Sequence, residues 1–392
     1  MDKSIPKLWS TKAECCGCSA CYAVCPTYAI EMKKDSRGFL YPVIDEQKCI
    51  GCKSCTRICA YKKDLKCSEK SNNKHSIYAV KAKDKDVVKN SSSGGMFTVL
   101  SDWIISQNGA IVSALYNSFT HKVEFKIYED THTRNQARGS KYIQADSGDV
   151  FKKALDWIKF HPDKNLLFIG TGCQASGFAE YTLKNKVRNR VIIVDLICHG
   201  APSPGLWERY ASDIEKKQGN QITRIAFKDK KNGWLKPSVY ALIGEKEVSI
   251  EGYSTWFYGE YSIRESCFQC PYTKIERSSD ITIGDYWGVN QKHPEFYDFM
   301  GVSLAILQSE QGRKVFEEIR KKVDCIEVSE EECLQPRLIS PANKPKNYDK
   351  FWNDIETKGF EYCEKKYKEI NHNSLWQSVK GKLMKIVRIK ND

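Results

Sequence analysis

The sequence predicts an α+β or α/β protein in three parts: a small N-terminal domain over residues 1–70, a mixed α/β domain over residues 76–342, and a helical, basic tail over residues 343–392. Three observations predict this organisation. A repeat of eight cysteines fills the first 60 residues, short apolar runs alternate with helical patterns through the middle of the chain, and basic residues alternate with apolar ones near its end. The length of 392 residues also exceeds one typical core.

The repeat reads Cys15-x2-Cys18-x2-Cys21-x3-Cys25-Pro26 and then Cys49-x2-Cys52-x2-Cys55-x3-Cys59. This spacing is typical of chains that hold two [4Fe–4S] clusters, in which three cysteines of each run bind one cluster and the fourth binds the other. The first domain therefore resembles bacterial dicluster ferredoxins. The predicted ligand sets are Cys15, Cys18, Cys21 and Cys59 for one cluster, and Cys49, Cys52, Cys55 and Cys25 for the other.

A pair of zinc sites is the alternative, because repeated Cys-x2-Cys pairs also bind zinc. A four-ligand zinc site gives no reason for the third cysteine, for the fourth at a spacing of three, or for Pro26 after it. The spacing therefore favours iron–sulfur clusters. Two positions depart from the repeat: Ala60 follows Cys59 where a proline is expected, and Cys16 is an additional thiol beside Cys15.

The net charge of +13 is concentrated at the two ends of the chain, residues 1–70 and 363–392. A basic surface near anionic clusters would attract an acidic redox partner, such as an external ferredoxin or flavodoxin. No nucleic-acid recognition motif accompanies the charge, so no nucleic-acid partner is expected. The sequence has 17 cysteines but neither a leader-like start nor an apolar run long enough to span a membrane. These features predict metal or redox chemistry in the cytoplasm.

Elements follow in order from apolar periodicity and turn residues. In the first domain, two strands surround the turn at residues 35–38, and a polar linker occupies residues 66–74. The predicted strands cover residues 28–32, 39–44, 77–81, 110–116, 123–128, 166–169, 191–197, 222–227, 239–243 and 303–307. The predicted helices cover residues 96–106, 150–160 and 312–322, and polar helices follow residue 344.

Alternation of short apolar runs with helices predicts a mostly parallel sheet, whose strand carboxyl ends carry ligands. Cys173 and Cys198 each come just after such a strand, and Cys267 and Cys270 form a Cys-x2-Cys pair. Each alone could be a buried structural thiol. Together they supply four soft ligands near one edge of the sheet. At the other end of the chain, residues 382–390 predict a solvated or packing helix that allows weak contact with a membrane surface.

Six segments occur in order along the middle of the chain. They are Gly94-Gly95-Met96-Phe97-Thr98, Gly139-Ser140-Lys141-Tyr142, Thr171-Gly172-Cys173-Gln174, Cys198-His199-Gly200, Cys267-x2-Cys270 and Asp280-x3-Gly284-x2-Trp287-Gly288. Together they resemble the coenzyme F420 hydrogenase/dehydrogenase beta-subunit family, which also includes chlorophyll-cycle hydroxymethyl reductases. The similarity covers roughly residues 77–342, and the ordered set is more specific than any one segment.

This resemblance implies an FAD protein in which Cys173, Cys198, Cys267 and Cys270 hold a third [4Fe–4S] cluster. A glycine pair at a helix start also leaves backbone N–H groups free to approach a phosphate. The residues implied to lie against the FAD are Ser93, Gly94, Gly95, Thr98, Gly139, Ser140, Lys141 and Tyr142. The candidate proton donors within these motifs are His199, Lys141, Asp285 and Tyr286, although His199 could equally orient its own loop.

The function predicted from these features is that of an iron–sulfur flavoprotein oxidoreductase, which exchanges electrons between ferredoxin-type clusters and an organic two-electron substrate through FAD. Two alternatives belong to other classes. One is a non-catalytic electron-transfer subunit that relays electrons to a partner enzyme, and the other is a zinc-bearing binding protein without redox activity. The sequence identifies neither the organic substrate nor a deazaflavin pocket, and it is compatible with a homo-oligomer.

Overall fold

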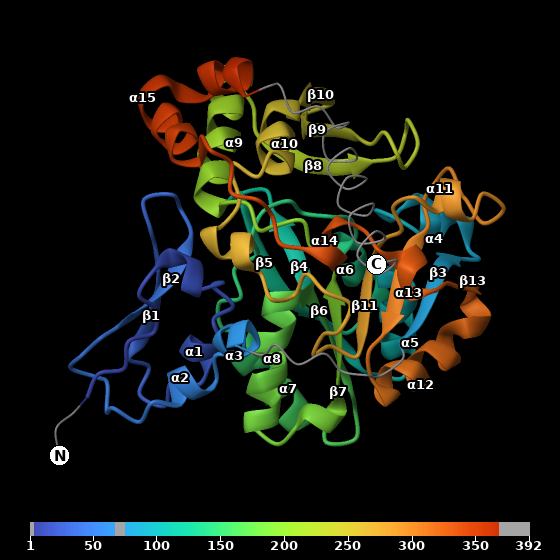
Figure 1. The fold of residues 1–392 in the computed structure, drawn as a ribbon, viewed down its shortest axis with the longest axis horizontal. Helices are drawn as coiled ribbons and strands as arrows, with labels where there is room; N and C mark the ends of the chain where they lie inside the picture. Colours follow the sequence, from blue (N-terminus) through green and yellow to red (C-terminus); the bar gives the residue numbers. More distant parts are fainter. Residues whose placement is uncertain (1–3, 67–74, 368–392) are drawn as a thin grey trace, which may run out of the picture.

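An eight-stranded mixed sheet forms the centre of the computed structural model, which describes residues 4–66 and 75–367 (Figure 1). Its strands run in the order β13-β3-β12-β11-β7-β6-β4-β5. Their bounds are β3 Ser76–Ala82, β4 Ala110–Asn117, β5 Lys122–Tyr128, β6 Leu166–Thr171, β7 Val191–Leu196, β11 Ile281–Asp285, β12 Ser303–Leu307 and β13 Val323–Glu327. The sequence-based expectation of a mixed α/β fold behind a small N-terminal unit is confirmed.

Helices cover both faces of this sheet and connect its strands. They are α4 Lys85–Lys89, α5 Met96–Ser106, α6 Thr131–Arg134, α7 Val150–Phe160, α8 Gly172–Lys184, α11 Val289–Lys292, α12 Glu310–Ile319, α13 Glu330–Cys333 and α14 Pro336–Ile339. The helix predicted over residues 312–322 therefore begins two residues earlier. Ser309 caps it by accepting a hydrogen bond from the Gly312 N–H at 3.0 Å, and its end tightens into a 3-10 turn at Arg320–Lys322.

Only three of the seven neighbouring strand pairs are parallel, so the expectation of a mostly parallel sheet is wrong. β4, β6, β7 and β11 run parallel, while β5, β12, β3 and β13 are joined to their neighbours in antiparallel fashion. The connection from β4 to β5 shows why, because residues 118–121 are too few for the crossover that a parallel pair needs. The parallel core still brings four strand carboxyl ends to one edge.

The N-terminal region, residues 4–66, contains an antiparallel hairpin and short helices that carry the cysteine repeat. Its elements are α1 Ala20–Ala23, β1 Ile30–Lys34, β2 Leu40–Ile44, α2 Ser54–Arg57 and α3 Ala60–Lys66. The two halves have nearly the same backbone. Gly17 and Gly51 both have a φ of 71°, and Ser19 and Lys53, which precede α1 and α2, have φ values of 66° and 57°. The sequence repeat is thus also a conformational repeat.

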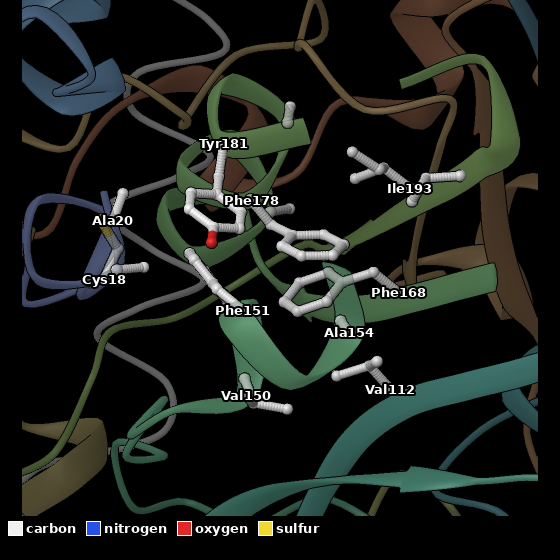
Figure 2. Packing of buried hydrophobic residues seen from close by; sticks show 14 of the residues in the cluster. Cys18, Ala20, Val112, Val150, Phe151, Ala154, Phe168, Phe178, Tyr181 and Ile193 are labelled. Carbon is white, nitrogen blue, oxygen red and sulfur yellow. The ribbon is translucent and has the colours of Figure 1, made fainter. Parts of the chain in front are cut away.

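The N-terminal region shares a hydrophobic core with the large sheet (Figure 2). Cys18 and Ala20 pack in the same buried cluster as Phe151 of α7 and Phe178 of α8. At Gly177 of α8, an added Cβ would lie 2.8 Å from the sulfur of Cys18, so glycine permits this close approach. The cysteine repeat is therefore held against α8, one of the helices that cover the sheet. Residues 67–74, most of the predicted linker, lie outside the described residues.

A second, three-stranded sheet and three helices cover the carboxyl-end side of the large sheet (Figure 1). Their bounds are β8 Ile222–Asp229, β9 Ser238–Ile243, β10 Lys246–Ser249, α9 Pro204–Gln218, α10 Glu251–Tyr258 and α15 Tyr348–Lys366. Aromatic side chains join these helices, with the rings of Trp256 and Phe351 5.5 Å apart.

The chain beyond residue 367 lies outside the described residues, and so do the tail helix predicted at 382–390 and its membrane contact. Within residues 4–66 and 75–367, no helix combines the length and the apolar character needed to cross a membrane.

Candidate functional site

The first thiol set, Cys15, Cys18, Cys21 and Cys59, gathers in the part of the N-terminal region that faces the large sheet. Burial raises the pKa of the Cys21 thiol well above its usual range, and the nearby charges of Cys15, Cys18 and Cys59 raise it further. Burial likewise raises the pKa of Cys59 to about 11, with Cys18 adding to the effect. Four cysteine sulfurs gathered in this way match the ligand set predicted for one iron–sulfur cluster.

The second thiol set, Cys25, Cys49, Cys52 and Cys55, lines one small cavity together with Pro26 and Ile30. These four residues are the set predicted for one cluster, so the structure brings them together. Backbone N–H groups point at two of the sulfurs, from Ala29 to Cys25 at 3.3 Å and from Gly51 to Cys49 at 3.4 Å. Such hydrogen bonds are a known means of tuning clusters.

The third thiol set, Cys173, Cys198, Cys267 and Cys270, converges at the carboxyl edge of the parallel strands. Cys173 lies in the first turn of α8, Cys198 follows β7, and Cys267 lies in the 3-10 turn Glu265–Gln269. Burial raises the pKa of Cys198 to about 11, with the charge of Cys173 adding to it, and raises that of Cys267 to about 12, with Cys198 adding to it. The four thiols are thus mutual neighbours, as the ligand set implied by the resemblance requires.

A single-ion metal site is absent from the described residues. Across the described ranges 4–66 and 75–367, no three His, Cys, Asp or Glu side chains come close enough together to hold one metal ion. A zinc site places all its sulfurs about 2.3 Å from one point. The larger core of an iron–sulfur cluster needs no such common point.

Cys16, which the sequence marks only as an additional thiol, lies between the first and third thiol sets. It is buried, and its thiol is hydrogen-bonded to both Cys173 and Cys18. The hydrogen bond from Cys16 lowers the pKa of Cys173 to about 7. Near it, the buried Tyr61 hydroxyl donates to the Ser266 carbonyl at 2.8 Å. Sequence reasoning could not place Cys16, because its neighbour Cys173 is 157 positions away.

A cavity of about 300 Å³ opens at the same edge of the sheet, beside the third thiol set. This volume is at the lower end of the range of about 300–1,000 Å³ that is usual for small-molecule sites. Cys198 lines the cavity. Of the eight residues predicted to contact FAD, six also line it: Ser93, Gly95, Gly139, Ser140, Lys141 and Tyr142.

Gly94 and Thr98 are not part of the cavity wall. A Cβ on Gly94 would lie 2.3 Å from the Val80 carbonyl oxygen, so this glycine permits close packing of two backbones. Thr98 is fully buried within α5, where its carbonyl accepts a hydrogen bond from Arg134 at 3.1 Å. Gly94 therefore allows close packing, and Gly95 lines the cavity.

The amino end of α5 gives the cavity an anion-binding character. Gly95 precedes this 11-residue helix with a φ of 96°, and no side chain caps the helix. Its first N–H groups are thus available to a negatively charged ligand, which the helix dipole also favours. The neighbouring loop is held in place because the Ser140 N–H donates to the Ser92 hydroxyl at 2.7 Å and Lys230 donates to the Ser93 carbonyl at 3.2 Å.

Lys141 is a cavity residue whose pKa lies close to neutral pH. Desolvation by burial lowers its pKa to about 7. Its ammonium donates hydrogen bonds to two backbone carbonyls, those of Ala137 and Arg138. A lysine with this pKa can carry or release a proton near neutral pH.

The other proposed proton donors differ in their surroundings. His199 lines the cavity against Phe257 and Tyr258, and burial, with the charge of Arg337, lowers its pKa to about 3. Asp285 also lines the cavity. Its carboxylate accepts hydrogen bonds from Lys228, Trp234 and Trp287, so it is placed as a hydrogen-bond acceptor and not as a donor.

Tyr286 is not a cavity residue. Its hydroxyl donates to the Glu332 carbonyl at 3.2 Å, because the side chains of successive residues at the end of β11 point in opposite directions. Tyr286 is therefore a poor candidate for a proton donor in this cavity.

Two family models match the chain. Residues 14–63 match the 4Fe-4S dicluster domain, and residues 163–332 match the C-terminal part of the coenzyme F420 hydrogenase/dehydrogenase beta chain. The chain therefore combines an iron–sulfur dicluster domain with a domain related to the F420 hydrogenase/dehydrogenase beta subunits, an oxidoreductase family.

Two individual proteins are also similar. The F subunit of the F(420)H(2) dehydrogenase of Methanosarcina mazei is 23% identical over 330 residues, which cover 80% of this chain and 84% of that protein. A xenon-derivatised structure of the F420-reducing [NiFe] hydrogenase complex from Methanosarcina barkeri has a chain that is 14% identical, with a TM-score of 0.45, over 76% of this chain and 91% of that one. The present protein is thus an iron–sulfur electron-transfer protein related to F420 hydrogenase/dehydrogenase.

Proposed function

We propose that this protein is an FAD-dependent oxidoreductase that exchanges electrons between its iron–sulfur clusters and an organic two-electron substrate. The observation that carries the proposal is that Cys198 belongs to the third thiol set and also lines the large cavity. A one-electron carrier and a two-electron cofactor would therefore be neighbours at one edge of the sheet. In this proposal the chain divides at the sequence-based boundaries, residues 1–70, 76–342 and 343–392, and acts in the cytoplasm.

The residues of the cavity fit a flavin dinucleotide. Bound FAD would supply the conversion between one-electron and two-electron transfer. The amino end of α5 and Lys141 would bind its phosphates, and the loop from Gly139 to Tyr142 would form one wall. Tyr142 is held there by stacking on Phe257, with the two rings 4.6 Å apart. The third thiol set would hold a [4Fe–4S] cluster beside this cavity.

Residues of the cavity wall would accept or donate protons near the substrate. Asp285 offers an acceptor fixed by Lys228, whereas Lys141 would bind the phosphates of FAD. His199 packs edge-on against two aromatic rings and keeps its loop in place. Phe257, Tyr258 and Trp287 also line the cavity and make part of its wall apolar.

Metal and flavin analysis of protein purified without oxygen tests the proposal. We expect about twelve iron atoms per chain, a similar amount of acid-labile sulfide, little zinc and one FAD. About eight iron atoms with one FAD would exclude the third cluster and leave the rest of the proposal standing. An absence of flavin from protein with full iron content would overturn the catalytic proposal, and zinc in place of iron would favour a binding protein without redox activity.

The pKa of Lys141 predicts a pH dependence of FAD binding. Because that pKa is lowered to about 7 in the free site, the cation that attracts phosphate is fully present only below this pH. A bound anion raises the pKa, so affinity should be highest below about pH 7 and fall as the pH rises through the new value. Lys141→Met should bind FAD more weakly with a flatter pH profile between about pH 6 and about pH 9.

Flavin fluorescence during titration of the deflavinated protein measures this effect. Lys126→Met on the exposed face of β5 is the matched control, and it should keep the profile of the unmodified protein. Parallel profiles for Lys141→Met and the unmodified protein would show that Lys141 does not contribute charge to the site.

A second candidate function is a relay subunit that passes electrons to a partner enzyme without turning over a substrate itself. The Methanosarcina mazei relative is named as a subunit of a dehydrogenase, and this observation favours a protein partner. In the first function, an external ferredoxin or flavodoxin exchanges electrons with the N-terminal region. Turnover of an organic two-electron acceptor by the isolated chain with reduced ferredoxin would support the first function, and turnover only in a complex would support the second.

A further inference from the structure

Arg264 is a buried cation between the N-terminal region and the third thiol set. Its side chain is 0% exposed, and it precedes Cys267 by three positions. The guanidinium donates from Nε to the Cys15 carbonyl at 2.7 Å, from Nη2 to the Leu40 carbonyl at 2.8 Å, and from Nη1 to the Gln144 side-chain oxygen at 3.1 Å. All three acceptors are neutral. A buried charge without a carboxylate among its hydrogen-bond partners is costly unless another negative group compensates it.

The negative groups nearest to Arg264 are cysteine sulfurs of two thiol sets. Nη2 lies 3.9 Å from the sulfur of Cys15 in the first set. On the other side, the Cys267 N–H donates to the Arg264 carbonyl at 2.9 Å, which holds the arginine beside the third set. Two features secure its position. The guanidinium carbon lies 4.0 Å from the centre of the Tyr41 ring, and an added Cβ on Gly17 would lie 2.8 Å from Nη1.

Gln144 extends this contact to the cavity. Its side-chain amide donates to the Cys16 carbonyl at 2.8 Å while its oxygen accepts from Arg264, and it lines the cavity. One arginine and one glutamine therefore connect the first thiol set, the third thiol set and the proposed flavin site. The second thiol set has no part in this network, because none of these bonds reaches Cys25, Cys49, Cys52 or Cys55.

We propose that Arg264 is a positioning residue shared by two clusters, which raises the reduction potential of both and fixes the first thiol set against the third. Reduction adds a negative charge to a cluster, and a fixed cation in a site of low dielectric constant favours the reduced form. For the first thiol set the inference concerns a cluster of the dicluster domain. For the third thiol set it rests on the proposed function.

Redox titration of the holoprotein, followed by EPR, tests this inference with a matched pair of variants. Arg264→Gln removes the charge. Arg37→Gln also removes an arginine that joins the N-terminal region to the rest of the chain, through Glu265 at 3.0 Å and Asp349 at 2.6 Å, but Arg37 bonds to no thiol of the described residues. We expect Arg264→Gln to make two cluster potentials more negative and to leave that of the second thiol set unchanged. Arg37→Gln should move none of them.

Two further variants keep the test decisive if Arg264→Gln loses iron. Gln144→Glu leaves Arg264 in place but sets a carboxylate against it, and should lower the same two potentials. Arg264→Lys keeps the charge and should retain potentials near those of the unmodified protein. Unchanged potentials in iron-replete Arg264→Gln or Gln144→Glu, or an equal shift of all clusters, would overturn the inference. If the unmodified protein holds only about eight iron atoms, the third cluster of the proposed function is excluded. The change in the potential of the cluster at the first thiol set then still tests the role of Arg264.

Discussion

Cys270→Ser will remove about four iron atoms from the protein and leave its FAD content unchanged. Cys270 belongs to the third thiol set, where burial and the charges of Cys267 and Cys173 raise its pKa well above the usual range. Unlike Cys198, it does not line the cavity, so its replacement separates loss of the cluster from damage to the flavin site. Iron, sulfide and flavin analysis of anaerobic preparations measures the change, and reduced ferredoxin should no longer bleach the flavin spectrum.

Cys325→Ser is the control for this experiment. Cys325 is a partly buried cysteine on β13, at the end of the large sheet opposite β5, and its replacement should keep all the iron. A Cys270→Ser protein with about twelve iron atoms and an unchanged EPR spectrum would exclude Cys270 as a ligand.

Gly95→Ala will abolish retention of FAD during purification. The φ of 96° at Gly95 lies in the left-handed region, where a residue with a Cβ is strained by about 1–2 kcal/mol, and the new methyl would lie 2.9 Å from Val87. Relief of this strain turns the first N–H groups of α5 away from the position in which they can bind a phosphate. Flavin absorbance per chain is the measurement.

Gly219→Ala provides the matched control, since Gly219 ends α9 with a φ of 68° and has no atom within 4 Å of its added Cβ. It should lose a similar amount of backbone stability in thermal unfolding and keep its FAD. Equal flavin content in the two variants would mean that the amino end of α5 does not hold the cofactor.

Local signals in the sequence were sufficient for several elements. The helices at Met96–Ser106 and Val150–Phe160 and the strand at Ser303–Leu307 have the predicted bounds, because apolar periodicity and flanking turn residues coincide there. α8 and α9 were missed although each has a start signal. Thr171 and Gln174 form a capping box at α8, and Ser203 precedes Pro204 at the first position of α9.

Tertiary arrangements were harder to predict, for physical reasons. Strand direction depends on the connections, so apolar runs alone suggested too many parallel strands. The spacing of the cysteines predicted which thiols of the repeat belong together, because these ligands lie within one short segment of the chain. Arg264 and Gln144, in contrast, contact Cys15 and Cys16 from more than a hundred positions away. Tyr286 illustrates a smaller failure, because it lies inside a motif but points away from the cavity.

The repeated backbone of the N-terminal region has a further consequence. Although Gly17 and Gly51 share the same conformation, the loop of Cys18 is sealed against Gly177 of α8, whereas Cys52 is exposed to solvent. The two halves have nearly the same backbone but different surroundings, one packed against the rest of the chain and one open to solvent. The repeat therefore yields two similar loops, and packing on α8 buries the cysteine of only one of them.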